Sequence, residues 1–565
     1  MRVVAFLYFF GSALLFGQAD KPAKKFTLDS VISPSVAGLK PPAWYPEIVS
    51  FDPAVSANSK EVQKHVSQGM ALLHAGWDFE AYRHFVEAVK KDEECLMAYW
   101  GIVLSLGNPN SEVNEHRLAA IERMIELVLL GKGTTSEQGQ AEALAFVFSD
   151  QPKRAPEVFA AVSEKFPNNL QLKLMASFVK RDGYDDLLGP GPGQLEALEE
   201  VEEILKNNTD SQMALSFWVA LQAEHPDATG KLRRVVLPRV RRLAAYSPNL
   251  PTYCELLGHF EKRAGNLLLA QKELEKAIKL YEQKLADDHI PYYDCPNLIR
   301  AQLSLASVYL SLDKFDSAFA IATKLAELEI DRDRLYSPGA TLILWEGKTL
   351  GARLCLARGK SSDFEKGLEV LPTKEEGQEL ASKTPSVMSW EAWRLALAAK
   401  SAIEKEDYES SERYLEALAA CDGLLDDVRS VVATTSSRKS WLRTRNALKV
   451  EWMLAKAALI NASVGDKAAS SASFWLQSAI DERETPEGIF PALSLSLPPK
   501  EKALHLSRTG DKAGALENFK LAIADYANDI SVLSSYEQAL RKYGEVDLAD
   551  AIQKHIGVVT GIQKK

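Results

Sequence analysis

Nine histidines and several runs of carboxylates are the residues of this sequence that could bind a metal ion or transfer a proton. A helical metal site of the metalloprotease type needs two histidines four residues apart, and no two histidines of the chain have that spacing. Acidic runs such as Asp92–Glu94 and Asp287–Asp288 are typical of solvated helix faces, whereas a glycosidase needs two carboxylates that only the fold could bring together. The sequence also lacks a GxSxG motif, a Walker-type phosphate loop and a dinucleotide-binding fingerprint. We therefore expect no catalytic residue, no metal ion and no cofactor.

One stretch of the chain, KLRRVVLPRVRR from Lys231 to Arg242, is strongly basic, although the formal net charge of the whole is -10. Such a stretch could receive a phosphate, an acidic polysaccharide or an acidic tail. The alternative, which we favour, is a solvated helix face paired with neighbouring Asp and Glu. Because the chain as a whole is acidic, we expect no nucleic acid among its partners.

The cysteines stand far apart, are odd in number and form no CxxC pair, so neither a disulfide framework nor a zinc site is expected. Cys254 and Cys295 could pair if neighbouring helices brought them together. We favour the alternative of isolated, buried thiols that act as small apolar residues. The five cysteines are Cys95, Cys254, Cys295, Cys355 and Cys421.

The first residues have the composition of a signal peptide. Arg2 is followed by the apolar stretch Val3–Phe16 and by small residues up to Ala19, where cleavage would leave Asp20 as the new N-terminus. The alternative is an uncleaved anchor, but the apolar stretch falls short of the ~20 residues that a membrane span needs. We therefore expect an exported protein, periplasmic or secreted, with no transmembrane segment in the mature chain.

The composition beyond this segment predicts an all-α fold. Residues 20–55 are rich in proline, which stops helices, so an extended lead-in is expected there. From about Val62 onward, apolar residues recur at three- and four-residue spacing among good helix formers, and strand signals are scarce. The likeliest break is the loop Leu188–Gly193, with softer breaks at Ser382–Pro385 and Pro491–Pro499. The predicted domains are the signal peptide (1–19), the lead-in (20–55) and three helical regions (56–188, 194–380 and 386–565).

One spacing of small and apolar residues recurs in the helical regions. A small residue is followed twelve positions later by a second small residue, four later by an apolar residue, and three later by another small or apolar residue. Two antiparallel helices that cross closely need small residues at the crossing and a large residue beside it. The copies are Gly69, Ala81, Phe85, Ala88; Gly258, Ala270, Leu274, Ala277; Ala306, Ala318, Ala322, Leu325; Ala503, Ala515, Phe519, Ala522; and, more weakly, Ala399, Ser411, Leu415, Leu418.

This pattern resembles the tetratricopeptide repeat, a helix–turn–helix unit of ~34 residues. Glycines in the expected turns are Gly76, Gly265 and Gly510. Three stretches look like one bacterial family of exported or cytosolic repeat proteins: AVKKDEECLMAYWGIVLSL, LPTYCELLGHFEKRAG with PYYDCPNLIRAQLSLASVYL, and PPKEKALHLSRTGDKAGALENFKLAIADY. The resemblance implies helix pairs stacked in a right-handed superhelix, an α-solenoid, in one array or in two. Residues 110–245 and 330–390 match poorly and are either diverged repeats or other helical inserts.

The resemblance also implies where a partner would bind, because the first helices of such repeats line a concave groove. One variant of the family clamps a C-terminal carboxylate with Lys and Asn, but Val66 and Met70 stand at those places here, so that activity is not carried over. The residues expected to face the groove are Met70, Leu73, His74, Glu255, His259, Lys262, Arg263, Leu303, Ser307, Ser311, Leu504, Ser507 and Arg508.

Three functions remain open on the sequence. The leading hypothesis is a non-catalytic scaffold that binds a protein or peptide outside the cytoplasm. The second is an exported protein that captures a glycan or nutrient, for which exposed Trp390 or Trp393 would be the first sign. The third is an enzyme whose site lies in the poorly matching stretches.

Overall fold

The computed structural model describes residues 26–48, 55–107, 111–149, 151–185, 189–223, 232–381, 386–427, 435–483 and 492–561. The predicted signal peptide and the break at Ser382–Pro385 lie outside these residues. The chain divides into two compact units, which are described separately: unit 1 comprises residues 1–182 and 192–218, and unit 2 comprises residues 183–191 and 219–565.

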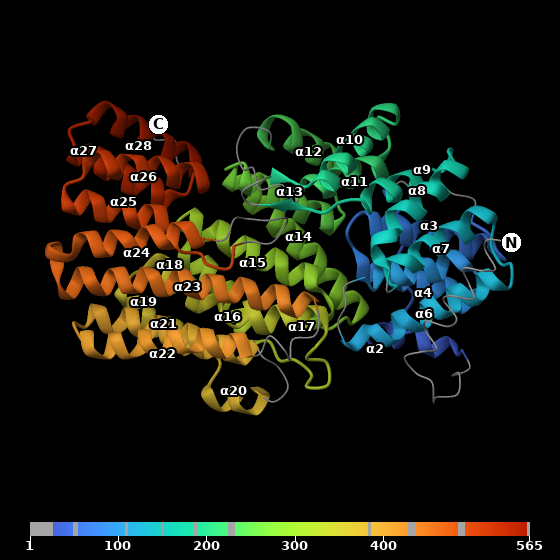
Figure 1. Cartoon of the computed structure of the whole chain (residues 1–565), viewed down its shortest axis with the longest axis horizontal. Coiled ribbons are helices and arrows are strands. Elements are labelled where there is room, and N and C mark those ends of the chain that lie inside the picture. Colours follow the sequence, from blue (N-terminus) through green and yellow to red (C-terminus); the bar gives the residue numbers. More distant parts are fainter. Residues whose placement is uncertain are drawn as a thin grey trace. The chain divides into compact units, whose positions relative to one another are not determined.

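Unit 1 is a series of antiparallel helix pairs that follow one another along the chain (Figure 1). The division between the units falls within α11. The elements of unit 1 are η1 (Leu28–Val31), α2 (Pro34–Ala37), α3 (Lys60–His74), α4 (Asp78–Lys91), α5 (Leu96–Ser105), α6 (Ser111–Leu129), α7 (Thr135–Val147), η2 (Pro152–Arg154), α8 (Ala155–Lys165), α9 (Leu170–Phe178), α10 (Pro192–Asn207) and α11 (Gln212–Ala223).

Unit 2 continues the same pattern and adds one short antiparallel ladder, in which Tyr184 pairs with Pro190. Its elements are β1 (Tyr184–Asp185), β2 (Gly189–Pro190), η3 (Leu232–Val236), α12 (Leu237–Tyr246), α13 (Pro251–Arg263), α14 (Leu267–Asp288), η4 (Tyr292–Asp294), α15 (Pro296–Ser311), α16 (Phe315–Glu327), α17 (Pro338–Leu342), η5 (Ile343–Gly347), α18 (Leu350–Arg358), α19 (Ser361–Val370), α20 (Lys374–Ala381), α21 (Ser386–Glu404), α22 (Tyr408–Asp427), α23 (Thr435–Ser463), η7 (Gly465–Ala468), α24 (Ala469–Glu482), α25 (Pro498–Thr509), α26 (Lys512–Asp525), α27 (Ile530–Lys542) and α28 (Val546–Val559).

The predicted fold class is confirmed, since stacked helix–turn–helix pairs of the tetratricopeptide type make up both units. The poorly matching stretches are helical too, as α6 to α12 and α17 to α20 show. Gly76, Gly265 and Gly510 all adopt the left-handed conformation at the turns where they were expected.

The close crossing of α3 and α4 depends on the absence of side chains at two glycines. A methyl group at Gly69 would lie 2.9 Å from the Phe85 ring, and one at Gly101 on α5 would lie 2.2 Å from it. Phe85, which is fully buried, therefore fills the space between α3 and α5. The repeat-core residues Gly69, Ala81, Phe85, Ala88, Gly258, Ala270, Ala277, Ala306, Ala318, Ala503, Ala515, Phe519 and Ala522 are all buried.

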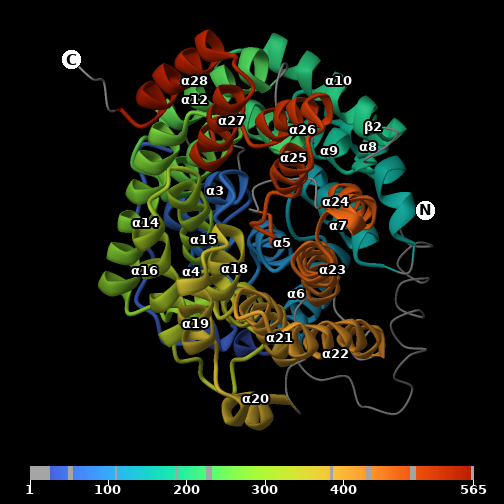
Figure 2. The same ribbon diagram turned by 90° about the vertical axis from the view of Figure 1, so that its left-hand side faces the viewer.

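In the pairs α13–α14 and α15–α16 of unit 2, the first helix is more deeply buried than the second. In α15 nearly every residue from Asn297 to Val308 is buried, whereas α16 buries only Phe315, Ala318, Ala322 and Leu325. In Figure 2, α15, α18 and α21 lie on the inner side of unit 2, and α14, α16, α19 and α22 lie on its outer side. We call the surface formed by the first helices the inner face.

The first and last helix pairs of unit 2 contact each other. The side chain of Asn528, in the turn between α26 and α27, donates a hydrogen bond to the carbonyl of Gly265 at 2.8 Å. Val559 of α28 packs against the cluster formed by Leu267, Leu274 and their neighbours on α14 and α15. The series of pairs from α13 to α28 thus closes on its own beginning.

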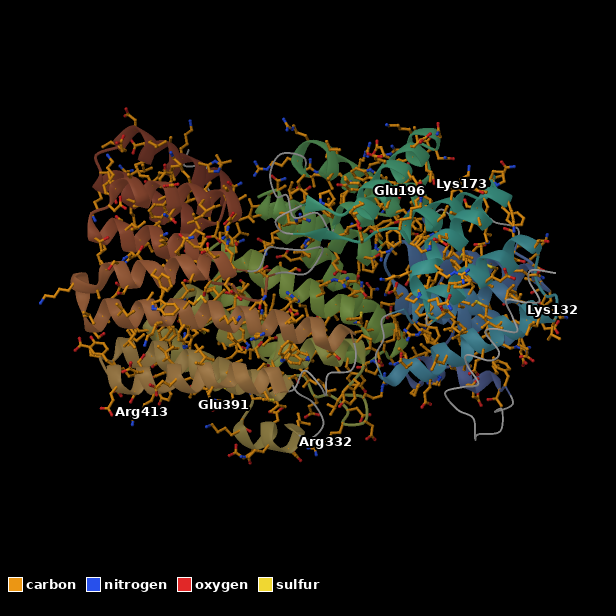
Figure 3. The ribbon with its side chains drawn as sticks, in the orientation of Figure 1. Lys132, Lys173, Glu196, Arg332, Glu391 and Arg413 are labelled. Carbon is orange, nitrogen blue, oxygen red and sulfur yellow. The ribbon has the colours of Figure 1, made fainter. Side chains whose placement is uncertain are left out.

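The periphery of both units carries ion pairs between exposed side chains. Lys132 lies 2.7 Å from Glu94 in unit 1, and Arg332 lies 2.7 Å from Glu379 in unit 2. Figure 3 shows Lys132, Arg332 and Arg413 pointing outward from the ribbon. Such pairs contribute at most about 1 kcal/mol each, because water screens them.

Candidate functional site

The groove residues predicted in unit 1 lie at different depths on α3. Met70 is fully buried, whereas Leu73 and His74 are partly exposed. The His74 ring packs against Phe217, with 5.2 Å between ring centroids, and Phe217 meets Phe178 edge-on. Burial disfavours the imidazolium and lowers the pKa of His74 to about 4, so this histidine is neutral at physiological pH.

His74 should make unit 1 less stable in mild acid. An unfolded histidine binds its proton near pH 6.5, whereas folded His74 binds it near pH 4, so the unfolded chain takes up the extra proton between these values. The free energy of unfolding of unit 1 is therefore unaffected by His74 above pH 6.5, and it is expected to fall by up to about 3 kcal/mol by pH 4. Hydrogen exchange of the α3 amides across this range measures the effect. His74→Leu should remove this part of the pH dependence, and an unchanged pH profile in that variant would contradict the prediction.

On the inner face of unit 2, Glu255 connects three helices. This residue of α13 is 3% exposed, and its carboxylate accepts hydrogen bonds from Arg300 Nε of α15 at 2.5 Å and from the Tyr281 hydroxyl of α14 at 2.9 Å. His259, one turn further along α13, is 4% exposed, and its ring meets Phe260 edge-on. Both predicted groove residues are therefore packed into the repeat array.

Among the predicted groove residues of unit 2, Lys262 has a side-chain pKa that is shifted far from its ordinary value. Its ammonium group donates a hydrogen bond to Ser307 Oγ at 2.6 Å, and Ser307 in turn donates to the carbonyl of Ser304 at 2.7 Å. Burial lowers the pKa of Lys262 to about 8, although the negative charge of Asp529 acts in the opposite direction. Lys262 therefore remains charged at neutral pH at a cost to the folded state.

Replacing Lys262 by methionine should stabilise unit 2. Since the folded pKa lies below the ordinary value of 10.5, the cost is present in full at pH 7 and disappears as the pH rises from 8 to 10.5. Methionine retains an apolar stem, so we expect the free energy of unfolding at pH 7 to rise by about 2 kcal/mol, from about 3 kcal/mol of relieved desolvation less about 1 kcal/mol for the hydrogen bond to Ser307. Denaturant unfolding measures the change, with Lys279→Met on the exposed side of α14 as the control. A loss of stability in Lys262→Met would disprove the prediction.

The remaining predicted groove residues separate into buried and accessible ones. Leu303 and Ser507 are buried, whereas Arg263 and Ser311 are partly exposed. Leu504 and Arg508 are exposed. A partner could thus reach Arg263, Ser311, Leu504 and Arg508, and also the partly exposed Leu73 and His74 of unit 1. The role of all six residues in binding stays a prediction.

The expectation of isolated, buried thiols is confirmed for Cys95, Cys254, Cys295 and Cys355, whereas Cys421 is free but partly exposed. Burial raises the pKa of Cys95 and Cys355 to about 12 and that of Cys254 to about 11, so little thiolate forms at neutral pH. Within the described part of the chain, no three His, Cys, Asp or Glu side chains lie together as a metal site would require.

Trp390 and Trp393 are 2% and 0% exposed, so neither presents a face on which a sugar could stack. The indole of Trp390 donates to the carbonyl of Leu344 at 2.7 Å. In the basic stretch, Arg241 forms a two-point ion pair with Glu261 at 2.6 and 2.9 Å, which agrees with the favoured interpretation of paired charges.

Part of the break predicted at Pro491–Pro499 is a segment outside helix and strand that lies on the inner face of unit 2, a position that the sequence did not predict. Residues 492–497, just before α25, lie against α18 and α23, and Figure 2 shows this stretch on the inner side of the helices. Leu493 is 1% exposed and belongs to the main hydrophobic cluster of unit 2, and Leu495 packs against the same cluster. We call residues 492–497 the inner strand.

Buried polar side chains of the inner face hold the inner strand. Arg353 of α18, which is 2% exposed, donates to the carbonyl of Leu493 at 3.1 Å and to that of Glu346 at 2.5 Å. Ser494 Oγ donates to a carboxylate oxygen of Glu451 on α23 at 3.0 Å. The inner face thus binds both the backbone and the hydroxyl groups of an extended segment.

Among the described residues of unit 1, helices and turns line hollows that open to solvent, of which the two following are examples. One, of about 490 Å³, is lined by Thr134, Glu137 and the turn Phe166–Gln171. The other, of about 630 Å³, lies along α8, α9 and α10 and includes Lys173, Lys180 and Glu200. Lys180 is already paired with Glu196 and Glu200 at 2.6 and 2.7 Å, and Figure 3 shows Glu196 on α10 and Lys173 on α9.

No protein-family profile and no curated protein matches the sequence. Among solved structures, human IFIT1 in its dimer with PPP-AAAA aligns at 12% identity over 89% of this chain and 95% of that one, with a TM-score of 0.36. The APC/C hetero-tetramer Cut9–Hcn1 aligns at 14% identity over 85% and 76%, with a TM-score of 0.30. The TPR domain of P58(IPK) aligns at 12% identity over 86% and 98%, with a TM-score of 0.19. These similarities are distant, and the fold assignment rests on the helix pairs of the chain itself.

Proposed function

We propose that the chain is a non-catalytic helical-repeat scaffold that binds an extended segment of a partner protein on the inner face of unit 2. One observation carries the proposal: this face already holds an extended segment, through Arg353 to the Leu493 carbonyl and through Glu451 to the Ser494 hydroxyl. A backbone carbonyl is present in every protein, so a buried arginine that binds one suits a peptide ligand.

Unit 1 supports the proposal with a second example of the same kind. Residues 26–48 run along α3 and α4, and Tyr82 accepts from the backbone N–H of Ser33 and donates to the carbonyl of Val31, both at 2.8 Å. Arg83 donates to the carbonyl of Lys40 at 2.9 Å. This segment contains the short helices η1 and α2, but the backbone groups of Ser33 and Lys40 that are bound lie outside them. Helix pairs in both units therefore bind main-chain groups of another segment through their side chains.

Cross-linked affinity capture from the native cell, with mass spectrometry and glycan analysis, tests the function. The inner-face variant is Arg263→Glu/Arg508→Glu, which changes accessible residues, and the matched control is Lys272→Glu/Lys279→Glu on the exposed side of α14. One protein recovered in near-equal amount with the wild type and the control, and lost with the inner-face variant, would support the scaffold. Glycan enrichment without a protein would favour the glycan-capturing alternative, and capture that is the same for all three chains would contradict an inner-face site.

We further propose that the mature chain is exported from a bacterial cell and acts outside the cytoplasm. The apolar stretch Val3–Phe16 after Arg2 supports export. The buried cysteines are compatible with an oxidising compartment, since thiols with a raised pKa react slowly. N-terminal sequencing of the protein from its native cell should give Asp20 as the first residue, whereas a retained Met1 would contradict the proposal.

A further inference from the structure

The segment between α24 and α25 is much longer than the turn that follows α25. α24 ends at Glu482 and α25 begins at Pro498, so fifteen residues join them, whereas Gly510 and Asp511 alone join α25 to α26. The last part of this long connection, the inner strand, lies on the inner face and not on the outer surface where loops usually run.

Within the inner strand, leucine and serine alternate and have different partners. Leu493 and Leu495 pack against the hydrophobic cluster, whereas Ser494 donates to Glu451 and the hydroxyl of Ser496 acts on the same carboxyl. The inner face therefore distinguishes apolar positions from hydroxyl positions. This arrangement provides specificity as well as affinity.

The inner face uses charged groups that are costly to bury. Arg353 and Glu451 are each 2% exposed, and a buried charge destabilises a fold unless its hydrogen bonds are satisfied. Burial raises the pKa of Glu451, although Ser496, Lys400 and Ser494 act in the opposite direction. The inner strand thus supplies two hydroxyl groups, those of Ser494 and Ser496, to this buried carboxyl.

We propose that the inner strand occupies the partner site of unit 2 in cis, and that the partner is an extended peptide with the same alternation of aliphatic and hydrogen-bond-donating side chains, which displaces it. This inference rests on the proposed function and deepens it, because it gives the chemistry of the partner and a means of regulation. A tethered segment competes at an effective concentration of about millimolar, so only a better-fitting ligand displaces it at low concentration.

The test on the wild-type full-length chain uses a synthetic peptide, acetyl-ALSLSLPP, which reproduces residues 492–499. At about millimolar peptide, hydrogen exchange of the backbone amides of Leu493–Leu495 should become faster as the inner strand is displaced. The matched control peptide, acetyl-ASLSLSPP, shifts the alternation by one residue and places serine where leucine must pack. Exchange that is unchanged by the first peptide, or changed equally by both, would overturn the inference.

A variant makes the same test more sensitive. Leu493→Ser/Leu495→Ser weakens the inner strand, so the fluorescently labelled first peptide should bind this variant at least about 30-fold more tightly than it binds the wild type. Leu269→Ser/Leu442→Ser, which changes two exposed leucines, is the control and should bind like the wild type. Equal affinities for all three chains would contradict occupancy in cis. Suppose that affinity capture recovers a partner that depends on Arg263 and Arg508, but neither peptide displaces the inner strand or binds the variant more tightly. That result would refute this inference alone and would leave the proposed function standing.

Discussion

Phe85→Ala is expected to lower the free energy of opening of α3 to α5 by about 3–5 kcal/mol, because it removes a fully buried ring and leaves a cavity between two glycines that cannot fill it. Gly69 and Gly101 have no side chains to move into the space, so the site can collapse only by moving whole helices. Hydrogen exchange of the α3 and α5 amides, measured fragment by fragment, reports this opening separately from unit 2.

The control for this prediction is Phe474→Ala, the same change at a residue that is 62% exposed and meets Trp475 edge-on. It should cost less than about 1 kcal/mol in unit 2. The complementary variant Gly101→Ala would place a methyl group 2.2 Å from Phe85 and should also destabilise unit 1. A loss below about 1 kcal/mol in Phe85→Ala would show that Phe85 does not hold the crossing together.

Arg300→Met is expected to lower the free energy of unfolding of unit 2 at pH 7 by about 3–5 kcal/mol, because the carboxylate of Glu255 stays buried after its cation is removed. The Tyr281 hydroxyl alone cannot replace the charge. Denaturant unfolding at pH 7 measures the loss.

Two further variants isolate the buried charge as the cause. Glu255→Gln/Arg300→Met removes both charges and should be more stable than Arg300→Met alone. Arg413→Met removes an arginine whose side chain is 67% exposed and 4.0 Å from Glu409, and it should change stability by less than about 0.5 kcal/mol. A double variant no more stable than Arg300→Met would contradict the argument.

The sequence predicts the helix pairs well because their packing is local. Gly69 and Phe85 are sixteen residues apart in one helix–turn–helix unit, and the close contact between them is encoded by that spacing alone. The same holds for Gly258, where a methyl group would lie 2.7 Å from Leu274. Residue size at a fixed separation is enough to predict such contacts.

The exposure of the groove residues could not be predicted in this way, because distant parts of the chain cover them. His74 packs against Phe217, and the charge of Lys262 interacts with that of Asp529. A repeat motif describes one pair of helices and its immediate neighbours, and it does not say what lies across the inner face. The placement of Trp390 and Trp393 in the core is closer to what the motif suggests, since helical aromatic residues most often pack inward.

The inner strand has a signal in the sequence. Residues 493–497 read Leu-Ser-Leu-Ser-Leu, which is the alternation of a half-buried strand inside a chain of helices. That pattern could have predicted an extended segment with one apolar face. It could not have identified Arg353 and Glu451 as its partners, since both lie far from it in the sequence.

The contact between Asn528 and Gly265 gives unit 2 a property that an open repeat array does not have. In a linear array the terminal repeats fray first, because each has a neighbour on one side only. Here the pair α13–α14 and the pair α27–α28 protect each other. The Asn528 side chain and the Gly265 carbonyl that it binds are 263 residues apart in the sequence. Opening at either end then exposes both ends at once, so unit 2 should unfold cooperatively, as a closed ring of helix pairs. Its folding should be slow, because so long a loop must close before the two ends make contact.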